Sequence, residues 1–183
     1  MLHLHNTIPY TPKDATSLLQ RGRQLVGSDV IIRDARISKK YIEFDTGVPG
    51  DMDVKAIVTR LETIAPLASY DEVIECHMEK DKALKRAVDL FNDEKYWEAH
   101  EVLENIWKNA NGFEKEILNG IILVAAAFVH DEKDEQDVCI SILQRAREKF
   151  GRASGNYYGI DINGIADTIY NIIKTGKVDR FTI

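Results

Sequence analysis

Apolar residues recur along this chain in two different patterns. Up to about residue 76, short β-branched and aromatic runs, typical of strands, alternate with stretches of helical periodicity. Beyond that point apolar residues recur every three or four positions, and none of the four prolines occurs after Pro66. The change predicts two domains, residues 1–77 and 78–183, with a boundary near Cys76 to Glu79.

The first domain has the predicted order strand, helix, strand, strand, helix, strand. These elements span about residues 2–8, 12–26, 29–37, 40–46, 50–65 and 69–76. This order is the split βαβ arrangement of a ferredoxin-like fold, so the expected class is α+β. Helices would cover only one face of such a sheet. We expect the other face to be wet, packed on the helical domain, or paired with a second copy in a homodimer.

The second domain is predicted to be all-α, with five helices. Their approximate spans are residues 79–91, 96–109, 114–129, 135–150 and 161–175. Asp134 and Asp161 are expected N-caps, and Gly151 and Gly176 are expected to follow helix ends. The third helix is almost wholly apolar from Ile117 to Val129, which indicates a buried central helix.

Residues 96–107, with the sequence YWEAHEVLENIW, gather aromatic, imidazole and carboxylate groups on one predicted helix. At about 100° per residue the apolar stripe is Ala99, Leu103 and Ile106, so a histidine and carboxylates border the core. Polar groups in that position are costly unless they are paired or used. The ligand-binding candidates on this helix and the next are Tyr96, Trp97, His100, Glu101, Glu104, Trp107, Asn119 and His130.

Three interpretations of this stretch remain open. In the first, His100 and Glu104 form a buried hydrogen-bond knot with Asn119 or a backbone carbonyl, which pins two helices in register. In the second, Tyr96, Trp97 and Trp107 wall a pocket in which Glu101 is the exposed polar group.

The third interpretation is a metal site, because His100-Glu101-x-x-Glu104 differs from the zinc-protease pattern only in its second ligand. Side chains four apart on a helix face the same way, and a carboxylate can bind zinc, manganese or iron. His130 is the best candidate for a third ligand, although Asn119 is closer to the level of Glu104. We therefore assign no metal and no cofactor.

Composition limits the classes of binding partner and the cellular compartment that we expect for this protein. A formal charge of −6 with 30% charged residues argues against general affinity for nucleic acid or an anionic membrane. No signal peptide is visible, and the longest apolar run, residues 121–129, is far shorter than the ~20 residues of a membrane span. Two cysteines without metal-ligand spacing fit a reducing cytoplasm. His3 and His5 share one strand face, but without a further ligand we interpret them as solvated or interface histidines.

The helical part resembles a known family. The residues that carry the resemblance are Phe91-Asn92, the 96–107 stretch, Leu118-Asn119-Gly120-Ile121-Ile122, Ala125-Ala126-Ala127 and His130. They are similar to the family called domain of unknown function 309, over roughly residues 82–173. The resemblance implies a small all-helical domain, and the family has no established activity. Asn119 and Leu123 stand where the family usually has glutamine, so the polar lining of any shared pocket is reduced here.

The leading hypothesis is a cytoplasmic binding module whose polar and aromatic pocket takes a small molecule or a peptide segment. The alternative is a metal-assisted hydrolase in which His100 and Glu104 hold the metal and Glu101 is the general base.

Overall fold

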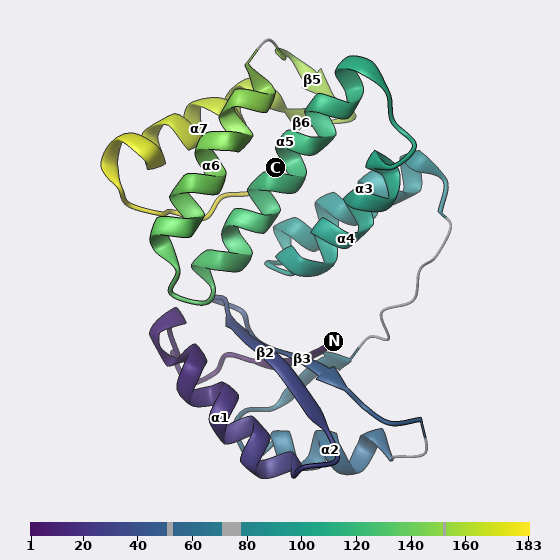
Figure 1. Ribbon diagram of the computed structural model, residues 1–183, viewed down its shortest axis with the longest axis vertical. Coiled ribbons are helices and arrows are strands. Elements are labelled where there is room, and N and C mark those ends of the chain that lie inside the picture. Colours follow the sequence, from purple (N-terminus) through teal and green to yellow (C-terminus); the bar gives the residue numbers. More distant parts are fainter. Residues whose placement is uncertain (51–52, 71–77, 152) are drawn as a thin grey trace. The chain divides into compact units, whose positions relative to one another are not determined.

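The protein combines α-helices with a small antiparallel sheet (Figure 1). The computed structural model describes residues 1–50, 53–70, 78–151 and 153–183. The chain folds into two compact units, Met1–Glu75 with Glu132–Asp134, and Cys76–Asp131 with Glu135–Ile183. We call them the sheet unit and the helical unit. Cys76 and His77, at the predicted boundary, lie outside the described residues.

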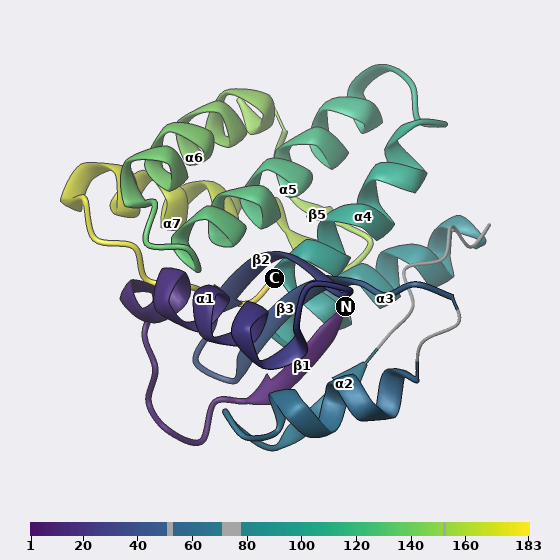
Figure 2. The same ribbon diagram turned by 60° about the horizontal axis from the view of Figure 1, so that its bottom comes forward.

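The sheet unit has four described strands in the order β2-β3-β1-β4, with antiparallel neighbours throughout. Its elements are β1 (Leu2–His5), a 3-10 turn (Pro12–Asp14), α1 (Ala15–Val26), β2 (Ile31–Ile37), β3 (Tyr41–Gly47), α2 (Val54–Leu61) and β4 (Leu67–Tyr70). Of the strand predicted at residues 69–76, the part from residue 71 lies outside the described residues. The helices α1 and α2 share one hydrophobic core with one face of the sheet (Figure 2).

Local chemistry explains where the helices of this unit begin. The Thr11 backbone N–H donates to the Asp14 carboxylate at 2.8 Å, and this bond lowers the pKa of Asp14. The second helix was predicted to open at Gly50-Asp51, and Asp51 lies outside the described residues. The helix begins later, at Val54, because Asp53 accepts a hydrogen bond from the Lys55 backbone N–H at 3.0 Å.

The sheet face opposite α1 and α2 carries a buried polar network. His3 Nε2 lies 3.2 Å from Glu43 Oε2, and the Arg36 guanidinium pairs with the other oxygen of the same carboxylate. Ser69 Oγ lies 3.4 Å from His3 Nδ1. Of the two predicted settings, solvated or interface, His3 is not solvated, because it is 0% exposed, whereas His5 is exposed. Leu2, His3 and Leu4 are all buried, and a buried imidazole is tolerated where it has a partner.

The helical unit packs its helices around a central one. Its elements are α3 (Lys80–Asn92), α4 (Tyr96–Trp107), α5 (Gly112–Asp131), α6 (Gln136–Phe150), the small hairpin of β5 (Asn156–Tyr157) and β6 (Ile160–Asp161), and α7 (Ile162–Thr175). α4 packs on α3 and α5, and α6 packs on α5 and α7 (Figure 1). The predicted burial of α5 is confirmed, with Leu118, Ala125 and Phe128 all 0% exposed.

Two details of this unit differ from the prediction. Asp134 does not cap α6, because its φ of 63° places it in the left-handed turn before the helix, and Glu135 stands at the N-cap instead. The hairpin β5–β6 was not predicted, because two-residue strands leave no periodicity in a sequence. The predicted cap at Asp161 is confirmed by its bond to the Gly164 backbone N–H at 3.1 Å.

Candidate functional site

The helix α4 places the predicted site residues on two neighbouring faces. Its core face is the predicted apolar stripe, Ala99, Leu103 and Ile106, extended by Tyr96 at the first turn, and all four side chains are buried. Trp97, His100, Glu104 and Trp107 follow the next face at the same three- and four-residue spacing and are half-buried. The candidates on α4 thus divide into a buried one, Tyr96, and a half-exposed group.

The half-exposed group centres on His100, whose side chain is 18% exposed. His100 Nδ1 lies 3.5 Å from Glu101 Oε1, and Nε2 lies 3.8 Å from Glu104 Oε1. The Trp97 ring stacks on the imidazole with centroids 5.8 Å apart. One donor atom from each of His100, Glu101 and Glu104 lies within 4.8 Å of the others. These three groups could hold a divalent cation from one side.

Two polar atoms on this face are buried without a hydrogen bond among the described residues. They are His100 Nδ1 and the indole Nε1 of Trp107, seven positions further along the helix. The Trp107 ring itself lies under the Lys115 ammonium, 4.5 Å from ring centroid to Nζ. Buried polar atoms normally have partners, so this face has hydrogen-bonding capacity for water or a bound group.

Asn119 and His130 do not join this group. Within the described part of the chain no hydrogen bond links Asn119 to His100 or Glu104, so the predicted inter-helix knot is not formed through that side chain. His130 Nδ1 lies 2.5 Å from Glu135 Oε2, and it is outside the cluster of His100, Glu101 and Glu104. The structure therefore leaves the proposed third metal ligand paired elsewhere.

Tyr96 belongs to an aromatic cluster that includes a residue from the end of the chain. Its ring meets Phe91 edge-on at 5.0 Å and Phe128 at 5.1 Å between centroids. Phe181 adds a fourth ring, 5.3 Å from Phe128 and 6.3 Å from Phe91. Such edge-to-face pairs contribute about 0.5–1.5 kcal/mol each beyond burial. Phe181 lies in residues 177–183, which follow α7 without helix or strand, and which we call the tail.

Two polar contacts flank this cluster and hold the tail. Arg180 Nε donates to Asp131 Oδ2 at 2.7 Å, and both side chains are 10% exposed or less. The Asn92 side-chain amide accepts from the Ile183 N–H at 2.8 Å and donates to the Ile183 carbonyl at 3.0 Å. We call the residues that receive the tail, Phe91, Asn92, Tyr96, Phe128 and Asp131, the tail site.

The residues of the tail site lie in a part of the chain that matches a known family. Residues 84–141 match the model of the domain of unknown function DUF309. This confirms the resemblance for α3, α4, α5 and the start of α6, and all five tail-site residues lie inside the DUF309 match, whereas the tail lies outside it. A search of curated proteins found no match. No helix in the described ranges is long and apolar enough to cross a membrane.

The tail site was missed from the sequence, although Tyr96 was among the candidates. The tail has no apolar periodicity, and its ion pair joins residues 49 positions apart. One signal was present in the DUF309 segment: Asp131 lies two residues after Val129, the end of the apolar run of a predicted buried helix. A carboxylate in that position needs a cation.

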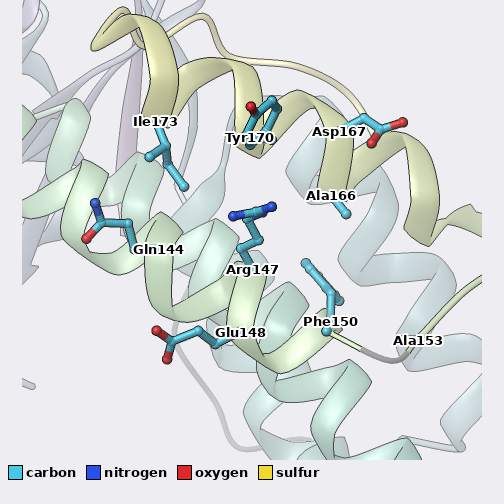
Figure 3. Close-up of a pocket in the computed structure, with 10 residues that line it drawn as sticks. Gln144, Arg147, Glu148, Phe150, Ala153, Ala166, Asp167, Tyr170 and Ile173 are labelled. Carbon is cyan, nitrogen blue, oxygen red and sulfur yellow. The ribbon is translucent and has the colours of Figure 1, made fainter.

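A cavity of about 620 Å³ lies between α6 and α7, away from the predicted motif (Figure 3). The Arg147 guanidinium lies 4.9 Å from the Tyr170 ring centroid, and in Figure 3 these two side chains approach each other across the cavity. Asp167 and Glu148 also line it, so its charged groups are mixed in sign. Sequence periodicity had assigned this region only to helices.

Proposed function

We propose that the helical unit is a binding module for an extended polypeptide segment, and that the tail site is where the segment binds. The observation that carries this proposal is the double hydrogen bond between the Asn92 amide and the main chain of Ile183. Of the two ligand classes that the sequence suggests, a small molecule and a peptide segment, this contact favours the segment.

A side-chain amide offers one acceptor and two donors, which complement the N–H and C=O that each residue of an extended chain presents. Peptide-binding sites use such main-chain contacts for affinity and neighbouring pockets for specificity. The tail meets both conditions, because Asn92 holds its main chain while Phe181 enters the aromatic cluster. Every residue of the tail site lies in the DUF309 match, so we propose peptide binding as a property of the matched segment. The tail lies outside the match and is the segment that is bound.

The test uses the full chain with a released tail. An Arg180→Ala/Phe181→Ala variant loses the ion pair and the ring contacts of the tail, so the tail is held more weakly and the tail site is open to a competing peptide. We expect a fluorescent peptide with the sequence of residues 177–183 to bind this variant in an anisotropy titration. Asn92→Ala in the same background should weaken binding about tenfold. Asn171→Ala, at an exposed position of α7, is the matched control and should have no effect. If the released variant keeps its helical circular dichroism but binds no peptide at about 1 mM, the proposal fails.

A second candidate, a metal-assisted hydrolase, is favoured by one observation, the convergence of donor atoms from His100, Glu101 and Glu104 within 4.8 Å. His100 and Glu104 would hold the metal and Glu101 would act as general base. Protein purified without chelator should then contain stoichiometric zinc, manganese or iron, measured by elemental analysis. His100→Ala should lose it, while His130→Ala, the matched control, should retain it. A metal-free native protein excludes this candidate.

The proposal extends to architecture and setting. Residues 1–77 would be a ferredoxin-like βαββαβ domain and residues 78–183 a five-helix domain. Support comes from the strand order β2-β3-β1-β4 and from the core that α1 and α2 share with the sheet. The free, buried Cys139 fits a reducing cytoplasm. A homodimer would form through the open face of the sheet, and light scattering of the purified protein, which gives its molecular mass, tests this.

A further inference from the structure

The residues of the tail differ in what the tail site requires of them. Arg180 is held by charge, Phe181 by ring contacts and Ile183 through its main chain. Thr182 is exposed, with no side-chain hydrogen bond among the described residues. The tail site therefore constrains a sequence as well as a conformation.

The position of Arg180 requires a cation. Asp131 is 8% exposed and is the last residue of α5, so its carboxylate adds to the partial negative charge of a helix C-terminus. The Arg180 guanidinium also lies 6.0 Å from the Tyr96 ring centroid, within the range of a cation–π contact. A neutral residue here would leave Asp131 buried without its cation, which is strongly unfavourable.

The position of Phe181 requires a planar ring. Phe128 receives this ring edge-on, with an interplanar angle of 78°, and Phe91 contacts it at 49°. An aliphatic side chain would lose the edge-to-face geometry that these pairs favour. Two positions later, Ile183 packs on the hydrophobic core of the unit while Asn92 holds its main chain, so an apolar residue fits there.

We infer that the natural partner is a polypeptide segment with a basic residue, an aromatic residue, any residue and an aliphatic residue in that order, and that it binds by displacing the tail. This inference rests on the proposed function, because it names the ligand of the same site. The tail is joined to α7 directly, which gives it a high effective concentration at its own site. In the native chain a partner therefore competes with residues 177–183.

The experiment titrates the labelled peptide of residues 177–183 into the native chain and into the Arg180→Ala/Phe181→Ala variant. We expect the released variant to bind at least ~10-fold more tightly than the native chain. On the released variant, peptides carrying Arg180→Gln or Phe181→Ala should each bind at least ~10-fold more weakly. The Thr182→Ala peptide is the matched control and should bind within ~2-fold of the parent.

A double-mutant cycle isolates the charge contact. In the released variant with Asp131→Asn added, the affinity difference between the parent and Arg180→Gln peptides should shrink to what the Tyr96 ring contact contributes. If the released chain proves unstable, Ile183→Pro releases the tail differently, because proline lacks the N–H that Asn92 accepts.

The outcomes separate the two proposals. Peptide binding that is indifferent to Arg180→Gln and Phe181→Ala overturns the sequence requirement and leaves the segment-binding function intact. Equal affinity of native and released chains overturns displacement. Absence of binding by either folded, released variant overturns the proposed function itself.

Discussion

Gly120 provides the sharpest quantitative test of the packing in the helical unit. It lies in α5 where Phe150 of α6 crosses, and a Cβ at residue 120 would stand 2.5–2.8 Å from three atoms of the Phe150 ring. That ring is buried and also lines the cavity between α6 and α7, so a Cβ at residue 120 must push the ring out of its packed position towards that cavity. Overpacking of a tight core costs about 1–3 kcal/mol, and contacts this short belong at the upper end. Alanine regains about 1 kcal/mol of helix propensity, which leaves a net loss of about 2 kcal/mol.

We therefore expect Gly120→Ala to lower the melting temperature by roughly 5 °C, measured by far-ultraviolet circular dichroism. Phe150→Leu shortens the opposing side chain, so Gly120→Ala in that background should cost less, and the double-mutant cycle should show a coupling of at least about 1 kcal/mol. Ser141→Ala, at an exposed position of α6, is the control and should change stability by less than about 0.5 kcal/mol. A higher melting temperature for Gly120→Ala, or an equal effect in both backgrounds, would refute the reasoning.

Three further expectations concern buried and paired groups. Burial raises the pKa of the Cys139 thiol from 9.0 to about 12, so over this pH range the native state keeps a proton that the unfolded chain loses. The free energy of unfolding, measured by urea denaturation, should therefore fall as pH rises from about 9 towards 12. In Cys139→Ala it should fall less steeply. Glu43→Gln removes the carboxylate that pairs with buried Arg36 and should destabilise the sheet unit by about 3 kcal/mol in the same assay; an unchanged urea midpoint contradicts this. The hydrogen bond from Lys80 lowers the pKa of Glu114, so this pair stabilises the fold above the unfolded pKa of the carboxyl, and the stabilisation is lost as pH falls. Because Glu114 is a third exposed, Glu114→Gln should lower the free energy of unfolding by less than about 1 kcal/mol at pH 7 and should have no effect in acid.

The elements that sequence reasoning located correctly are those set by local chemistry. Helical periodicity identified the buried stripe of α4 and the buried length of α5, because every third or fourth residue must meet the core. Caps were equally readable where one side chain and one nearby backbone group suffice, as at Asp161, and Gly176 ends α7 with a φ of 69°.

Local signals failed where the backbone departs from the usual cap geometry or where the partner is distant. Asp134 has the right side chain for an N-cap, but its positive φ makes it a turn residue, which composition does not distinguish. His3 alternates with Leu2 and Leu4 as an outward-facing residue should, yet it is buried, and its partner there, Glu43, is 40 positions away in the sequence. Pairings at such separations depend on strand register, which is set by the hydrophobic pattern of whole strands and by the turns that join them, and by no single residue.

In the candidate site, too, contacts within one helix were predicted correctly and contacts with distant residues were not. The approach of His100 to Glu104 follows from helix geometry alone, because residues four apart share a face. Contacts between two helices also depend on how far along each helix axis the residues lie, which the sequence does not give. Asn119 and His130, the candidates on α5, did not join the cluster. The tail site required a third kind of information, the path of a segment without periodicity.

The two functional candidates on α4 use different residues, and this makes them independently testable. The tail site includes Tyr96 but neither His100 nor Glu104, and the donor cluster includes no residue that contacts the tail in the described structure. His100→Ala should therefore remove any bound metal without changing peptide affinity, and the Arg180→Ala/Phe181→Ala variant should open the tail site without changing metal content. If either substitution affected both readouts, one site would depend on the other through α4, because that helix carries Tyr96 and His100 one turn apart.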